Sequence, residues 1–272
     1  SNHNTLVTIN GGSVKSEAGA AIYHPQYGKL VINGGVVQGS TGVEMRAGVI
    51  EVNAGTLKGG DGEFKDPTSN PGGNTSDNVA LAIVQHTTKL PIVVNVNGGS
   101  FEATQAFLQA NPEKNGASDV EEIEISVSDG SFSGGVKSEN FSAKDGDGFI
   151  SGGSFTENPV AYVTKDSAVK IDLESSFEVL ERGNLPAGTY VVPEGAEQLT
   201  SKDFESGLVV TIDPVTGQAT ATRPQAPSQG EHAVKVEQAE GGKVVVAPTT
   251  ADEGDEVTIT ATPDKGQEVR SV

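Results

Sequence analysis

The chain has 272 residues, a formal net charge of −19, 35 glycines, and neither cysteine nor tryptophan. The acidic excess opposes binding to nucleic acids and to anionic membrane surfaces. The absence of cysteine excludes a disulfide scaffold and a cysteine nucleophile, and no apolar run in the sequence reaches the length of a membrane span. This composition suits a soluble extracellular protein, or one that collects divalent cations, with no insertion into a membrane.

One short phrase occurs six times between residues 9 and 155. The copies share two apolar positions around a mostly polar one, with Gly148 as an exception at the first. Asn or Ser follows, then two mostly small residues, and an apolar side chain stands two positions after them. The second small residue is glycine in every copy: Gly12, Gly35, Gly55, Gly99, Gly130 and Gly153. Successive glycines are 23, 20, 44, 31 and 23 residues apart, so the base period is about 22 residues with two insertions, which is typical of solenoid repeats.

Equivalent positions of the six copies carry equivalent side chains. Three residues before each glycine the side chain is aliphatic: Ile9, Ile32, Val52, Val96, Val127 and Ile150. Two residues before it, Asn10, Asn33, Asn53 and Asn97 are followed by Ser128 and Ser151. Four asparagines in one column are expected to stack as an amide ladder. An antiparallel meander would not need this identity, whereas stacked coils would, so we predict a parallel β-helix of about six coils.

The insertions and the end of the repeats follow in chain order. Residues 58–78 are mostly Gly, Asp, Asn, Ser and Pro, which predicts a surface loop, and the strand pattern resumes at 79–85. A shorter insertion follows the strand at 106–109. The phrase stops after Phe155, and residues 157–171 predict the start of a cap, because an uncapped solenoid exposes its core and an unpaired strand edge.

Beyond the repeats, short strands separated by turn residues fill 175–222, and a Pro-containing linker follows at 223–231. We therefore expect three parts. They are a parallel β-helix at 1–174, a small β element or cap with its linker at 175–225, and a β-rich module at 226–272. Because the chain ends in a strand pattern, the last module is expected to be incomplete or completed by residues outside this chain.

Two stretches carry resemblances to known proteins. The phrases INGG and VNGGSF, with GAAIYHP, GVEMRAG and ALAIVQHTTKLPI, resemble repeat-bearing surface proteins of Gram-positive bacteria over roughly residues 5–165. That resemblance implies a right-handed parallel β-helix of the pectate-lyase-like type. The segment GGKVVVAPTTADEGDEVTITATPDKGQEVRSV is similar to the divergent B-repeat of internalin-like surface proteins. Together they imply an extracellular protein of the bacterial cell surface, and they imply no activity.

A ligand-binding face is predicted where strands of neighbouring coils carry polar side chains. Glu44 and Arg46 are two residues apart and therefore share one face of a strand. The other candidates belong to similar strands of coils one and three: Tyr23, His24, Gln85 and His86. A basic, hydrogen-bonding strip on an acidic protein is a candidate ligand site. The alternative is that these side chains are surface residues that satisfy one another.

Acidic turns raise the question of calcium. Asp61 and Glu63, and likewise Asp145 and Asp147, have the alternating oxygen spacing of calcium loops. Neither pair completes a twelve-residue loop with a terminal glutamate, and Asp-Gly is also a common turn dipeptide that needs no metal. We expect no cofactor and no metal site, with calcium at either pair as the alternative.

The function expected from these features is a non-catalytic, adhesin-like module that presents a rigid β-helix surface to a glycan or to a host or cell-surface protein, acting as a monomer. The alternative is a polysaccharide-active β-helix enzyme, either a lyase or a glycosidase. The Asp-Asp and Gly-His-Gly clusters of such enzymes are missing, and the scarcity of tyrosine and lack of tryptophan leave few sugar-stacking platforms. No residue is predicted to be catalytic.

Overall fold

The computed structural model describes residues 5–144, 146–172, 176–224, 232–236, 241–251 and 255–269. The chain divides into two compact units, residues 1–223 and residues 224–272. Within the described residues the protein is mostly β: a large mixed sheet, partly parallel, lies in the first unit, and two small sheets lie in the second. Across that part of the chain, no helix is long and apolar enough to cross a membrane.

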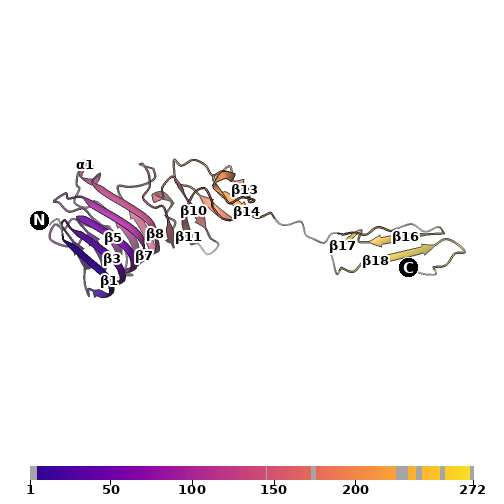
Figure 1. The fold of residues 1–272 in the computed structure, drawn as a ribbon, viewed down its shortest axis with the longest axis horizontal. Coiled ribbons are helices and arrows are strands. Elements are labelled where there is room, and N and C mark those ends of the chain that lie inside the picture. Colours follow the sequence, from indigo (N-terminus) through magenta and orange to yellow (C-terminus); the bar gives the residue numbers. More distant parts are fainter. Residues whose placement is uncertain are drawn as a thin grey trace. The chain divides into compact units, whose positions relative to one another are not determined.

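A first row of strands forms the long parallel part of the sheet (Figure 1). Its members are β1 (Leu6–Lys15), β3 (Lys29–Gln38), β5 (Gly48–Lys58), β7 (Ile92–Gln109) and β8 (Ile123–Ser138). Each pairs in parallel with the next, and the register places Ile9 beside Ile32, Ile32 beside Val52, and Val52 beside Val96. Equivalent residues of successive copies are therefore neighbours, as predicted from the repeat.

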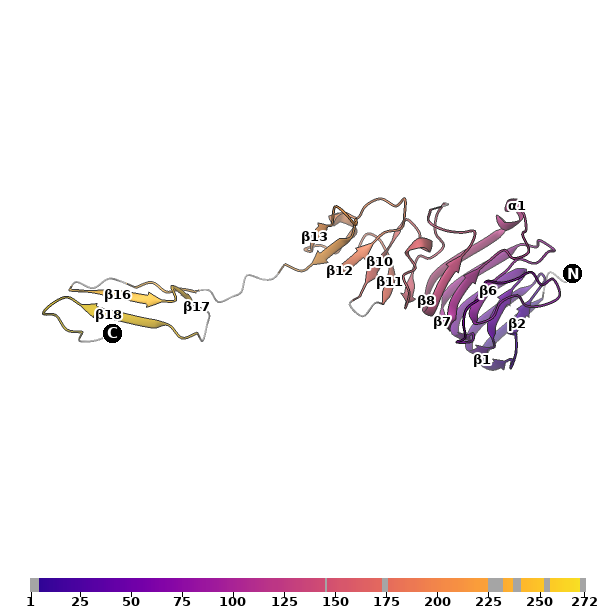
Figure 2. The same ribbon diagram turned by 180° about the vertical axis from the view of Figure 1, so that it is seen from behind.

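A second row is built from the shorter strands between these repeats, with β2 and β6 labelled in Figure 2. Its members are β2 (Ala20–His24), β4 (Thr41–Met45), β6 (Val79–Ile83) and the C-terminal part of β7. These strands also pair in parallel, with Tyr23 beside Glu44, Glu44 beside Ala82, and Ala82 beside Leu108. Each of these repeats thus contributes one strand to each row.

The core is a set of side-chain columns shared by both rows. The aliphatic column predicted from the sequence is buried from its second member on, with Ile32, Val52 and Val96 fully inaccessible to solvent, and Ile9 is half-buried. In the column after the bend, the rings of Phe101 and Phe132 stack at 4.6 Å, and those of Phe132 and Phe155 stack at 4.7 Å. Parallel rings at this spacing follow directly from coils that lie one strand apart.

The asparagine column forms the predicted amide ladder. The Nδ2 of Asn33 donates to the Oδ1 of Asn10, Asn53 donates to Asn33, and Asn97 donates to Asn53, each at 2.9 Å. The serine of the next copy continues the column, since Ser128 Oγ donates to the Oδ1 of Asn97 at 3.4 Å. The ladder prediction is therefore confirmed, and it has one direction, from later coils to earlier ones.

Glycine is required at the bend because successive backbones approach closely there. Gly35 has φ +84°, and a Cβ on this residue would lie 2.7 Å from the carbonyl oxygen of Gly12. The same holds one coil later, where a Cβ on Gly55 (φ +93°) would lie 2.8 Å from the backbone of Gly34. Only a residue without a side chain tolerates both this backbone conformation and this distance.

The parallel rows end in antiparallel strands. β9 (Gly153–Phe155) pairs in parallel with β8 and antiparallel with β11 (Phe177–Glu181). The sheet then continues through β10 (Ser167–Ile171), β12 (Gly188–Val191), β14 (Ala219–Thr222) and β13 (Val209–Ile212). The β element predicted at 175–222 is thus hydrogen-bonded to the repeats. The boundary predicted between 174 and 175, and residues 225–231 of the predicted linker, lie outside the described residues.

The remaining elements are short. One α-helical turn, α1 (Ala117–Val120), precedes β8, and two 3-10 turns, η1 (Val160–Tyr162) and η2 (Ser201–Asp203), lie in the antiparallel part. In the second unit β15 (His232–Ala233) pairs antiparallel with β17 (Thr250–Ala251), and β16 (Gly242–Ala247) pairs antiparallel with β18 (Thr258–Pro263). These strands match the predicted β-rich module.

Candidate functional site

The outer face of β4 carries the two charged residues singled out in the sequence. Val43 and Met45 point into the main core, and Glu44 and Arg46 alternate with them on the outer face. The side chains of Glu44 and Arg46 are nonetheless fully buried and lie 3.2 Å apart. Something must therefore cover this face of the strand.

The cover is the long loop, residues 59–78, which returns over the second row before β6. Its end is fastened to Glu44. Both carboxylate oxygens of Glu44 accept hydrogen bonds from the backbone N–H of Thr75 at 2.9 Å, and Oε2 accepts from that of Ser76 at 3.1 Å. The hydroxyl groups of the same two residues donate at 3.1 and 2.6 Å. A buried carboxylate is stable only with such complete pairing.

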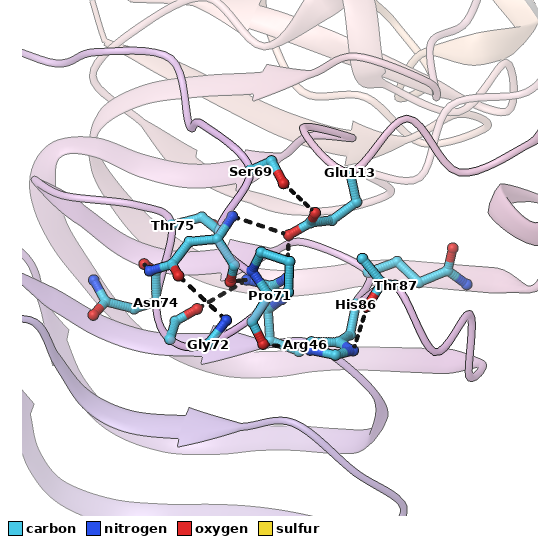
Figure 3. Close-up of polar contacts among 12 residues, drawn as sticks. Arg46, Ser69, Pro71, Gly72, Asn74, Thr75, His86, Thr87 and Glu113 are labelled. Atoms are coloured by element: carbon cyan, nitrogen blue, oxygen red, sulfur yellow. Dashed lines mark hydrogen bonds and ion pairs between the residues drawn. The ribbon is translucent and has the colours of Figure 1, made fainter.

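Arg46 fastens the middle of the long loop. Its Nη1 donates to the carbonyl oxygens of Gly73 and Asn70, at 3.1 and 3.5 Å. Its Nη2 pairs at 2.6 Å with Glu113, whose side chain is 1% exposed. Glu113 belongs to the short loop, residues 110–116, between β7 and α1. Arg46 therefore ties two separate insertions to the same strand (Figure 3).

Glu113 is held as a carboxylate by several donors. Ser69 Oγ donates to Oε2 at 2.6 Å, and the backbone N–H of Asn70 donates to Oε1 at 3.2 Å. Burial acts to raise the pKa of Glu113, but the hydrogen bonds from Ser69, Arg46 and Asn70, with the charge of Arg46, outweigh it and lower that pKa below its ordinary value. Figure 3 shows this carboxylate between Ser69 and the guanidinium.

His86 lies at the border of the same cluster. Its Nδ1 accepts the backbone N–H of Thr88 at 3.1 Å, so in the neutral ring Nε2 carries the proton. That nitrogen lies 3.0 Å from the carbonyl oxygen of Pro71 and donates to it. His86 is thus a third attachment point for the long loop.

An apolar contact completes the attachment. Phe64 of the long loop packs against the buried cluster formed by Val79, Ala82, Val84, Leu108 and Ala110 on the outer face of β6 and β7. Lys137 of β8 lies 5.6 Å from the centre of the Phe64 ring and also pairs with Asp66. The loop is therefore held by ionic, hydrogen-bonding and apolar contacts together. We call Glu44, Arg46 and Glu113, with the loop groups they bind, the clasp.

The remaining predicted residues lie around the clasp in different ways. Tyr23 is half-buried beside Glu44. The pKa of its phenol is raised, because burial and the charges of Glu44 and Glu113 together outweigh the lowering effect of Arg46. His24 Nδ1 lies 2.9 Å from the carbonyl oxygen of Ala47. Gln85 is buried, donates to the carbonyl oxygens of Leu90 and Asp119, and accepts from Asn115. Of the six residues, Glu44, Arg46 and His86 join in one cluster, and they bind protein groups there.

The acidic turns show no metal-ligand arrangement in the part of the chain that the structure describes, where no group of three or more His, Asp or Glu side chains could hold a metal ion. Asp145 lies outside that part. The Oδ1 of Asp147 accepts the backbone N–H groups of Gly148 and Lys165, at 3.0 and 2.9 Å, so this oxygen is bound to protein backbone.

Sequence reasoning found Glu44 and Arg46 but missed the other members of the clasp. Glu113, Ser69, Thr75 and Ser76 all lie in insertions, where the repeat offers no equivalent position to compare. The one available signal is that the two insertions follow neighbouring coils at the same side of the stack, next to a strand with two charged residues.

Comparison with known proteins gives one match, in the second unit. Residues 232–271 match the family model of the divergent InlB B-repeat domain. This B-repeat segment contains β15 to β18, so the resemblance noted in the sequence is confirmed there. The B-repeat supports a module of a cell-surface protein. Comparisons with curated proteins and with solved structures found no match to the chain.

Proposed function

We propose that this chain is a non-catalytic, adhesin-like module of an extracellular bacterial surface protein. In this proposal the parallel repeats form a right-handed, pectate-lyase-like β-helix of about six coils, which presents a rigid polar surface for binding a glycan or a protein. Two parallel rows in register support the helical path, the hand comes from the resemblance, and the B-repeat match supports the location.

The observation that carries the binding role is the clasp. Loops of this length are usually mobile and vary in conformation. Here five hydrogen bonds from loop residues to the buried Glu44 carboxylate and two from Arg46 to loop carbonyl oxygens fix one conformation. The side chains of Asp61, Glu63, Lys65 and Thr68 remain exposed on that fixed backbone. A preorganised polar surface pays little ordering entropy when a ligand binds.

The same contacts argue against catalysis at the predicted face. Arg46, the candidate base that directly follows β4, is fully buried and paired with two carboxylates, so a polysaccharide has no access to it. His86 is engaged with the loop backbone. The net charge of −19 supports partners other than nucleic acid.

The test is a glycan and protein array probed with three forms of the chain. The loop variant is Asp61→Ala/Glu63→Ala/Lys65→Ala/Thr68→Ala, which changes exposed side chains and leaves the clasp intact. The matched control, Glu121→Ala/Glu122→Ala/Glu124→Ala, changes exposed side chains near the start of β8. We expect binding by the native chain and the control, and a loss of about tenfold or more in the loop variant.

An array signal that survives in the loop variant would move the binding surface elsewhere, and no signal from the native chain would contradict the binding role. Incubation with uronic-acid polymers, followed by measurement of unsaturated product, tests the enzymatic alternative. Turnover by the native chain would overturn the non-catalytic assignment.

A further inference from the structure

The first coil shows its interior side chains to solvent. Val7 is 47% exposed, whereas Leu30 and Ile50, which follow it in the same column, are 1% and 0% exposed. Leu6 is 63% exposed. Val7 therefore occupies a position that the next three coils bury, because β1 is the outermost strand of the parallel row in the described chain. Leu6 stands in a different column, beside Lys29, whose later members are only half-buried.

Gly11 of β1 is likewise uncovered at a place where the equivalent glycines of later coils contact the preceding coil. In later coils the first glycine of the phrase lies against the preceding coil: a Cβ on Gly34 would be 3.0 Å from the carbonyl oxygen of Asn10, and one on Gly98 would be 2.7 Å from that of Asn53. Gly11 is the equivalent residue of coil one. A Cβ on Gly11 would meet nothing within 4 Å, and its φ lies outside the left-handed range that favours glycine. The space beside Gly11 is therefore open, whereas beside Gly34 and Gly98 the backbone of the preceding coil fills it.

The amide ladder ends in an unused donor. Each asparagine of the ladder donates its Nδ2 hydrogen to the Oδ1 of the preceding coil. Asn10 accepts from Asn33, but its own Nδ2 donates to no group among the described residues. A strand placed beside β1 with an oxygen acceptor at this level would continue the ladder by one more step.

We propose that the outer edge of β1 is a docking surface for one further parallel strand of the same repeat type. The occupant is an extended segment with apolar residues at alternate positions, then a residue with a side-chain oxygen acceptor, then two small residues. The interface is continuous with the β1–β3, β3–β5 and β5–β7 pairings, which already use this register. Docking covers Val7 and satisfies the Asn10 donor.

A second copy of the chain fits this edge less well. Two β1 strands related by a two-fold axis run antiparallel. That arrangement brings two Asn10 donors together in place of a donor and an acceptor, and it abandons the parallel register in which Gly34 and Gly98 approach the preceding coil. The features of β1 therefore favour a parallel strand of the repeat.

The test uses a fluorescent peptide with the sequence of β3, residues 29–38, and measures its anisotropy with the full chain. The variant Gly11→Val places a side chain where the docked backbone would lie, while the chain itself has room for it. Gly146→Val is the matched control, because Gly146 also has open space around it, away from β1. Hydrogen exchange of residues 6–15 locates the bound peptide.

We expect the peptide to slow exchange in β1, with an affinity that falls by about tenfold or more in Gly11→Val and is unchanged in Gly146→Val. A peptide in which the asparagine corresponding to Asn33 is leucine should bind more weakly, since it lacks the acceptor for Asn10. Binding that ignores Gly11→Val, or no binding up to the peptide's solubility limit, would overturn the proposal. So would a dimer of the chain, seen by analytical ultracentrifugation, that Gly11→Val abolishes.

Discussion

A single arginine organises the region where function is proposed. Arg46 is fully buried, yet it contacts two carboxylates and two loop carbonyl oxygens, and only its Nε lacks a partner among the described groups. Taking a guanidinium out of water costs several kcal/mol unless it is paired in this way. The arrangement is therefore best understood as a device that specifies one loop conformation, with a modest net gain in stability.

Glu113→Gln tests this role of the clasp. The folded-state pKa of Glu113 is lowered, so its contribution to stability is fully present above the unfolded pKa and is lost as the pH falls through the folded one. At neutral pH we expect a loss of about 2 to 3 kcal/mol in the free energy of unfolding. The difference from the native chain should shrink below about pH 4. Urea titrations of both proteins between pH 7 and pH 3 measure it.

Glu51→Gln is the matched control for that experiment. The pKa of Glu51 is also lowered, first by its hydrogen bond from Lys29, but this ion pair is at the surface, with the lysine side chain 44% exposed. We expect a much smaller loss at neutral pH, because solvent and salt screen exposed pairs. Equal losses for the two variants would contradict a special role for the clasp.

At the scale of elements, stacking explains why the repeats were predictable and the insertions were not. A residue such as Val52 or Asn53 has equivalents above and below it, so its column and its partners follow from the spacing of the glycines. Glu113 has no equivalent, and its pairing with Arg46 depends on how two loops fold over β4. The antiparallel pairing of β9 with β11 likewise has no signal in the repeat.

The amide ladder gives a prediction at this scale. Asn53 donates to Asn33, accepts from Asn97 and also donates to Glu51 at 3.0 Å, whereas the terminal Asn10 makes one ladder bond. We expect Asn53→Ala to lower the free energy of unfolding by about 1 to 2 kcal/mol, and Asn10→Ala to lower it by clearly less. Urea denaturation of the two variants compares them; an equal effect would show that the ladder does not add stability step by step.

At the scale of the whole molecule, the two units differ in how much buried apolar core each contains. The first unit contains the main core and every aromatic residue, including Tyr23, Tyr27, Tyr162 and Tyr190. In the described part of the second unit only Ala251 is a buried apolar residue, and Val245 and Ile259 are about half exposed. Small two-stranded sheets of this kind are marginal on their own.

We therefore expect a chain that ends at Arg223 to unfold like the full chain. Tyrosine fluorescence reports the first unit selectively, because residues 224–272 contain no tyrosine. The urea midpoint and slope of the shortened chain should equal those of the full chain. A lower midpoint would show that the B-repeat segment stabilises the first unit.

The antiparallel turn-back at β9 and β11 makes the stack a rod with unlike ends. A filament that grows by head-to-tail addition needs two complementary faces, and here one end has been converted to antiparallel strands that finish in the four-residue β13. Such a short outer strand offers little length for pairing. Any lengthening of this repeat array by strand pairing is thus confined to the β1 edge, so the array has no second complementary face for head-to-tail growth into a filament.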